Sequence, residues 1–118
     1  MDIDDVPAEL QKALRRLGGS VELLRDVAQI YLEDYGGIAG ELRKAIQRGD
    51  APAAERAAHS LKGLSSNFDR TQLVERCERI EKLARGGSLA EAGPLLADVH
   101  RETVTLTAAL RDFLGVPQ

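Results

Sequence analysis

A long apolar seam constrains the fold of this chain more than any other feature of its sequence. Between residues 21 and 45, apolar side chains recur at spacings that alternate between three and four residues. This period matches one face of an α-helix, whereas a strand would need alternation at every second residue. The seam consists of Val21, Leu24, Ala28, Tyr31, Tyr35, Ile38, Leu42 and Ala45. The pattern predicts a long helix that begins after Ser20, a suitable N-cap, and stops near Gly49.

Three glycines lie inside this seam, at Gly36, Gly37 and Gly40. Each interior glycine costs about 0.5 to 1 kcal/mol relative to alanine, which favours a bend or a break. The apolar seam nevertheless stays in phase across them. We therefore expect a single helix.

Two further segments show the same helical period. One begins after Asp50, a suitable N-cap, with Pro52 in the first turn, where a missing N–H does little harm. The other is predicted to begin at Asp69, which forms a capping-box pattern with Gln72, and to stop at Gly86. Their inward faces are Ala54, Ala57, Leu61, Leu64 and Phe68 in the first, and Leu73, Cys77, Ile80 and Ala84 in the second. The single cysteine is thus expected to be a small buried side chain.

The last helical segment and the N-terminus complete the pattern. Ser88 and Glu91 form another capping-box pattern, but Pro94 lies too deep for an unstrained helix from Ser88, so we expect a kink or a restart at Gly93 and Pro94. The seam of this segment is Ala92, Leu96, Val99, Thr103, Leu106, Leu110 and Phe113. Near the N-terminus, Pro7 and the apolar face Leu10, Leu14 and Leu17 predict a short helix that covers one end of the fold.

The expected fold is all-α. No segment alternates with a two-residue period between hairpin turns, and short loops between four long helices make consecutive helices antiparallel neighbours. We expect an up-down-up-down antiparallel four-helix bundle with a short additional N-terminal helix. At 118 residues, the chain is expected to form a single domain spanning residues 1–118.

Composition narrows the possible functions. Sixteen basic and nineteen acidic residues give a net charge of −3 without a dense Lys/Arg stripe, so nucleic acid is an unexpected partner. No apolar run approaches the roughly 20 residues that cross a bilayer, and the acidic N-terminus does not resemble a signal peptide. The single cysteine excludes an internal disulfide. We expect a cytoplasmic monomer, and the absence of an obvious linker at either end favours a free-standing protein.

His59 is predicted to lie on the outward face of its helix, opposite the apolar seam. Lys62 and Gly63 follow at i+3 and i+4, Ser66 at i+7, and Arg56 precedes at i−3, so all five share this face. An ordinary solvated histidine is the alternative. An exposed glycine within a helix costs about 1 kcal/mol without a packing benefit, which indicates that something approaches the helix closely.

The stretch "AAHSLKGLSSNF" resembles the signature of histidine-containing phosphotransfer (HPt) domains, A-H-x-L-K-G followed by small residues and Asn. The similarity extends through "LRRLGGSVELLRDVAQIYLED", "LRKAIQRGD" and "CERIEKLARGG", and so covers nearly the whole chain. The resemblance implies that His59 accepts a phosphoryl group from the aspartyl phosphate of a receiver domain and passes it to another response regulator. The implied partners are receiver domains and a hybrid sensor histidine kinase.

The resemblance also implies roles for the neighbours of His59. Lys62 would stabilise the phosphoryl charge, and Gly63 would let the receiver approach. Arg56 and Ser66 are candidate partner contacts, although for Arg56 a plain solvated role is an equal alternative. Magnesium is expected on the receiver rather than on this chain. No G-x-x-x-x-G-K-[ST] or G-x-G-x-x-G motif is present, so we expect a carrier without its own ATP site, cofactor or metal, and not an enzyme.

Two other functions compete with phosphotransfer. An HPt-like adaptor would bind receiver domains without carrying phosphate, and would have lost His59 or Lys62, but both are present. A di-metal bundle needs Glu-x-x-His pairs, and neither His59 nor His100 has a glutamate three residues before it. One departure from the HPt pattern is visible, since Asp69 stands where the family commonly has glycine. We interpret Asp69 as an N-cap that alters this turn.

Overall fold

The computed structural model describes residues 2–118, and its regular structure is entirely helical over that range. The α-helices are α1 (Gln11–Arg16), α2 (Val21–Gln47), α3 (Ala51–Ser66), α4 (Thr71–Arg85) and α5 (Gly93–Leu114). Short 3-10 helices span Ile3–Asp5, Ala8–Leu10 and Leu89–Ala92. The expectation of an all-α protein is confirmed.

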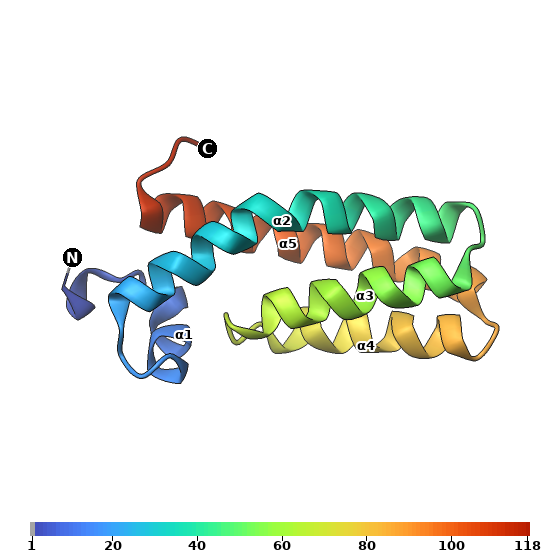
Figure 1. Cartoon of the computed structure of the whole chain (residues 1–118), viewed down its shortest axis with the longest axis horizontal. Helices are drawn as coiled ribbons and strands as arrows, with labels where there is room; N and C mark the ends of the chain where they lie inside the picture. The colour runs from blue at the N-terminus through green and yellow to red at the C-terminus, as the bar shows by residue number, and fades with distance from the viewer. Residues whose placement is uncertain (1) are drawn as a thin grey trace.

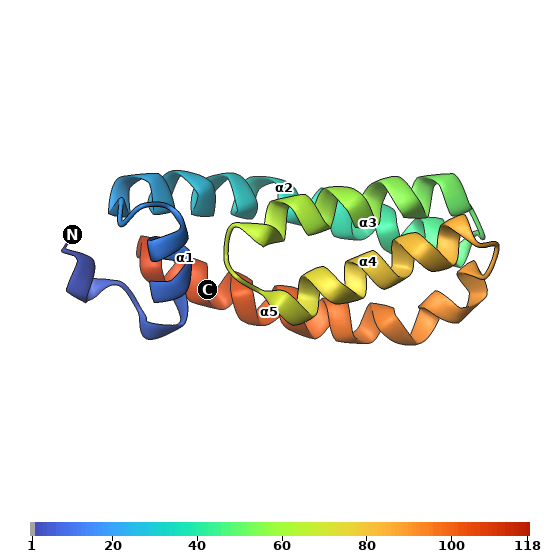
Figure 2. The same ribbon diagram turned by 90° about the horizontal axis from the view of Figure 1, so that it is seen from below.

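The four longer helices lie side by side along the long axis of the molecule, and the chain reverses direction from each to the next (Figure 1). Each of α3 and α5 packs against both α2 and α4. Figure 2 shows α1 beside the start of α2 and the end of α5, at the end of the molecule opposite the α2–α3 turn. The short N-terminal helix therefore covers one end of the fold, as predicted.

Two apolar clusters form the core. One lies around α3, α4 and the adjoining ends of α2 and α5, and includes Leu42, Ala54, Leu61, Leu73, Cys77, Ile80 and Val99. The other joins the N-terminal segment to α2, α5 and the α3–α4 turn, and includes Leu10, Leu14, Leu24, Tyr31, Phe68, Leu106, Leu110 and Phe113. The predicted seams thus supply most of the buried side chains, because a helical period of three and four residues gathers them on one face.

Two of the four predicted capping side chains, Ser20 and Asp50, are observed at the starts of their helices. Ser20 Oγ accepts a hydrogen bond from the backbone N–H of Leu23 at 3.0 Å, and Asp50 caps α3 by accepting from the N–H of Ala53 at 3.2 Å. α2 continues unbroken through its three glycines. α5 restarts at Gly93 with a proline in its first turn, also as expected. The Ser88 capping box is wrong, since Ser88 makes no side-chain cap and a 3-10 helix follows it.

The prediction for Asp69 is also wrong. α3 ends at Ser66, the N-cap of α4 is Arg70, and Asp69 lies in the turn between them with a φ of 55°. This left-handed conformation suits glycine best, although aspartate tolerates it better than most residues. Its carboxylate accepts a hydrogen bond from Arg16 at 3.2 Å and lies 4.0 Å from Lys12 Nζ. Asp69 therefore joins the turn to α1 instead of capping α4.

Asp69→Gly is expected to leave the free energy of unfolding within about 1 kcal/mol of the wild-type value, because relief of the left-handed backbone offsets the loss of exposed ion pairs. Asp69→Ala loses the same ion pairs but keeps the backbone strain. We expect it to be less stable than Asp69→Gly by about 1 kcal/mol. Urea denaturation measures both, and equal stability of the two variants would contradict the role assigned to the backbone.

Candidate functional site

His59 lies near the middle of α3 on a face that points away from the core. The opposite face of this helix is fully buried and carries Ala54, Ala58 and Leu61. Because the helical period turns those side chains inward, His59 falls on the solvent side, and 71% of its side chain is exposed. The predicted outward orientation of His59 is therefore observed.

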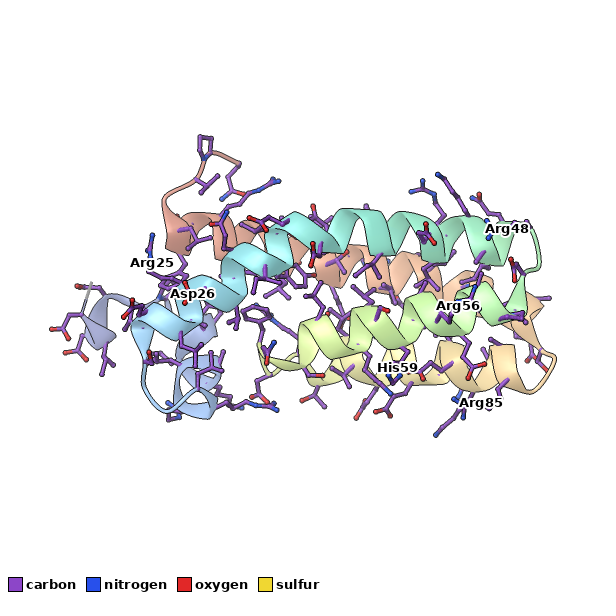
Figure 3. All side chains as sticks on the ribbon, viewed as in Figure 1. Arg25, Asp26, Arg48, Arg56, His59 and Arg85 are labelled. Carbon is purple, nitrogen blue, oxygen red and sulfur yellow. The ribbon has the colours of Figure 1, made fainter. Side chains whose placement is uncertain are left out.

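A buried carboxylate lies directly beside His59. Glu81 projects from α4, and only 7% of its side chain is exposed. Its Oε2 lies 3.2 Å from His59 Nδ1, and its Oε1 lies 2.9 Å from Lys62 Nζ. Arg85 places Nη2 3.7 Å from Glu81 Oε2 and donates from Nε to Glu55 at 3.0 Å. Figure 3 shows His59 and Arg85 on the same edge of the molecule, where α3 and α4 adjoin.

The contacts of Glu81 determine its charge. Burial opposes ionisation of Glu81, but its hydrogen-bonding contacts with Lys62 and His59 outweigh burial and hold the pKa of this carboxyl below its usual value. The contact with Glu81 in turn raises the pKa of Lys62. Glu81 is therefore an ionised acceptor, and His59 Nδ1 must donate to it. This tautomer leaves the lone pair of His59 Nε2 available.

The other predicted site residues differ in how closely they join this cluster. Lys62 belongs to it, with its side chain 25% exposed and directed at Glu81. Gly63 is exposed, and a Cβ added there would meet nothing within 4 Å. The Ser66 hydroxyl donates a hydrogen bond to the backbone carbonyl of Lys62 at 2.6 Å, so it is bonded within α3. Arg56 is exposed and lines the same surface hollow as His59.

Comparison with known proteins identifies the family. A sequence model described as the Hpt domain matches residues 26–114. This chain belongs to the Hpt domain family. The crystal structure of histidine-containing phosphotransfer protein B (HptB) from Pseudomonas aeruginosa PAO1 is similar, with a TM-score of 0.77 and 29% identity over 86% of this chain and 89% of that one. No curated protein matches the chain.

Membership in the Hpt family gives this chain a histidine phosphotransfer role in a phosphorelay. Proteins of this family are phosphoryl carriers that interact with kinases and with receiver domains of response regulators. Within residues 2–118, no group of three or more His, Cys, Asp or Glu side chains is placed to hold a metal ion. None of the helices in that range is both long and apolar enough to cross a membrane.

Glu81 is the residue of the His59 cluster that sequence reasoning missed. It directly follows Ile80 and stands four residues after Cys77, both of which are fully buried. A carboxylate beside such a seam should have been predicted to meet a cation from a facing helix, because buried carboxylates are paired. The sequence does not show which residues of a neighbouring helix lie level with Glu81, so the partners His59 and Lys62 could not be named.

The tautomer of His59 provides a direct test of the contact with Glu81. In wild-type protein with a neutral imidazole, we expect Nδ1 to carry the proton and Nε2 to be bare in two-bond ¹H–¹⁵N correlation spectra. Glu81→Met removes the acceptor, so a mixture of both tautomers is expected. Glu75→Met, an exposed change on the same helix, should leave the wild-type pattern. A mixed tautomer in the wild type would contradict the assignment.

The lowered pKa of Glu81 predicts a dependence of stability on pH. A carboxyl with a folded pKa below its unfolded value of about 4.3 stabilises the protein above that pH, and loses this contribution as the pH falls through the folded value. Glu81→Gln should therefore be less stable than wild type near neutral pH. The difference should shrink steadily below about pH 4. Denaturant titrations at several pH values measure it, and a constant difference down to strong acid would contradict the prediction.

Proposed function

We propose that this protein is a phosphorelay intermediate in which His59 accepts a phosphoryl group from a receiver-domain aspartyl phosphate and passes it to another response regulator. It would act as a monomeric single domain, with its long helices in an up-down-up-down antiparallel four-helix bundle. The observation that carries the proposal is an exposed imidazole whose Nδ1 contacts a buried, ionised carboxylate. Exposure makes the ring accessible to a partner, and the contact of Nδ1 with Glu81 favours reaction at Nε2.

This geometry supports the following transfer step. The lone pair of His59 Nε2 attacks phosphorus as the bond from phosphorus to the aspartyl oxygen breaks, and that electron pair stays on the receiver's carboxylate. The ring becomes positively charged while it holds both the phosphoryl group and the Nδ1 proton. Glu81 accepts a hydrogen bond from that proton and so stabilises the charged ring. The reverse sequence of steps delivers the group to the next receiver.

The neighbours of His59 complete the proposal. A phosphoryl group adds about two negative charges, and Lys62, one helical turn away, can contribute a counter-charge while it stays anchored by Glu81. The open surface at Gly63 gives the loops of the receiver room for in-line approach. Arg56 and Ser66 would contact the partner at the edge of the site. The magnesium ion that compensates the phosphoryl charge would belong to the receiver.

The decisive experiment mixes the purified protein with a purified receiver domain that carries a radiolabelled phosphoryl group, and follows label on both proteins. We expect the label to move to this protein and then onward to a second receiver. The linkage should be lost in acid and persist in base, which is the behaviour of a phosphohistidine. A phosphate on Ser60 or Ser65 would behave in the opposite way. A base-labile, acid-stable product would contradict the proposal.

The competing function is an adaptor that binds receiver domains without carrying phosphate. It predicts complex formation with a receiver and no label on this chain at any time. Titration calorimetry measures the binding, and the labelling experiment measures the transfer. Binding without label across a panel of phosphorylated receivers would favour the adaptor.

A further inference from the structure

A second surface hollow lies between α2 and α3, next to the one that contains His59. Glu33, Asp34 and Glu41 line it from α2, with Gly37 between them, and Arg56 and Ser60 line it from α3. Arg56 and Ser60 also line the hollow around His59, so the two are continuous. Figure 3 shows Arg56 on the side of α3 that faces α2, and His59 on the side that faces α4. We call the α2–α3 hollow the acidic groove.

The glycine in the acidic groove has no internal explanation. The backbone at Gly37 is helical rather than left-handed, and an added Cβ would meet nothing within 4 Å. Neither backbone conformation nor packing inside this molecule therefore requires glycine. The same holds for Gly36 and Gly40, but Gly37 alone among them lines the groove, where the missing side chain leaves room for the close approach of a partner.

The carboxylates of the acidic groove also lack cationic partners within the molecule. Several other exposed or half-buried acids pair with arginine, as Asp50 does with Arg48. No basic side chain within residues 2–118 forms an ion pair with Glu33, Asp34 or Glu41. These three acids face a single base on the walls of the groove. The surface is therefore electrostatically complementary to a basic partner.

An apolar contact extends this surface. Ile30 is 49% exposed, and it precedes Glu33 and Asp34 by one turn of α2. A single exposed aliphatic side chain is common on protein surfaces, but at this position Ile30 could make an apolar contact with a partner that fills the groove. The groove thus offers acidic side chains and an open position at Gly37, it adjoins the His59 hollow at Arg56 and Ser60, and Ile30 lies one turn away on α2.

We propose that the acidic groove and Ile30 form the docking surface that selects among receiver domains, and favour those with lysine or arginine beside the phosphorylated aspartate. The inference rests on the proposed function and names the partner chemistry of the same site. Docked there, a basic receiver would place its aspartyl phosphate over His59. Charge on the rim acts mainly on the association step and on KM, since it does not touch the reacting atoms.

The test measures kcat/KM of phosphotransfer to this protein from a panel of purified receiver domains with basic and acidic surfaces. The double variant Glu33→Lys/Glu41→Lys should lower kcat/KM for the preferred receiver at least about tenfold, through KM, and weaken its salt dependence. The control Glu22→Lys/Asp112→Lys makes the same charge change at exposed positions outside the groove. Charge reversal on the receiver should restore the rate. An effect equal to that of the control would overturn the proposal.

A second pair of variants tests the open position at Gly37 independently of charge. Gly37→Met and Gly36→Met should both raise the melting temperature, because methionine is the better helix former. Gly36 does not line the groove, so only Gly37→Met should also lower kcat/KM, again about tenfold. Equal transfer rates for the two variants would overturn the role of Gly37 in docking.

Calorimetric titration with the same receivers separates this inference from the proposed function. Binding that weakens in the groove variants, without any label on His59, would overturn the phosphotransfer proposal and leave the docking surface intact. Label on His59 with unchanged binding and rates in every groove variant would overturn the docking surface alone.

Discussion

His59→Gln is expected to abolish phosphoryl uptake from a labelled receiver, with a loss of more than about a thousandfold. Glutamine keeps a polar side chain of similar reach but has no ring nitrogen with a nucleophilic lone pair. Because His59 is exposed, the fold should not depend on it, and the circular dichroism spectrum and melting temperature should stay close to wild type. Transfer of radiolabel measured with one receiver preparation gives the comparison.

The other histidine of the chain supplies a matched control. His100 is exposed on α5, outside the His59 hollow, so His100→Gln should carry wild-type amounts of label. Equal labelling of His59→Gln and wild type would contradict the assignment of the phosphoacceptor. Loss of labelling in both variants would show that the assay reports something other than transfer to His59.

Phe68→Ala is expected to lower the free energy of unfolding by about 3 to 5 kcal/mol. Phe68 is 2% exposed, and its ring packs edge-on against Tyr31 with centroids 5.5 Å apart. It anchors the α3–α4 turn in the cluster that also holds α1. Truncation leaves a cavity between segments that belong to different parts of the chain, so a simple local collapse cannot fill it. Chemical denaturation measures the loss.

Two comparisons sharpen this prediction. Val104→Ala removes apolar atoms from a residue that is 53% exposed on α5, so it should change stability by less than about 0.5 kcal/mol. The contacts among His59, Lys62 and Glu81 involve none of the residues in the Phe68 cluster, so folded Phe68→Ala should still accept a phosphoryl group. A stability loss below about 1 kcal/mol would contradict the anchoring role of Phe68.

The helices could be predicted from the sequence because their signals are local. The α2 seam from Leu24 to Ala45 needs only the helical period, and the caps at Ser20 and Asp50 need only the next three residues. The outward orientation of His59 follows from the same period. These features depend on neighbours within one or two turns, which a sequence displays directly.

The features that were missed depend on tertiary contacts. Glu81 meets His59 across 22 residues of chain, and this contact requires the register of α4 against α3. Asp69 was predicted to be an N-cap because aspartate is a common residue at that position. The structure instead places it in a left-handed turn, where basic side chains of α1 pair with its carboxylate. Local chemistry allowed both interpretations, and the packing of a distant segment decided between them.

The buried carboxylate of Glu81 also affects how stable a phosphoryl group on His59 would be. If His59 is phosphorylated as proposed, the charge of Glu81 has two opposing effects on the loaded state, since it stabilises the positively charged ring and repels the phosphoryl oxygens. Lys62 would then lie between the carboxylate of Glu81 and the phosphoryl group, and it would divide its hydrogen bonds between them. We expect these opposing effects to keep loading and unloading of His59 close to balance. A relay protein needs that reversibility more than it needs tight storage.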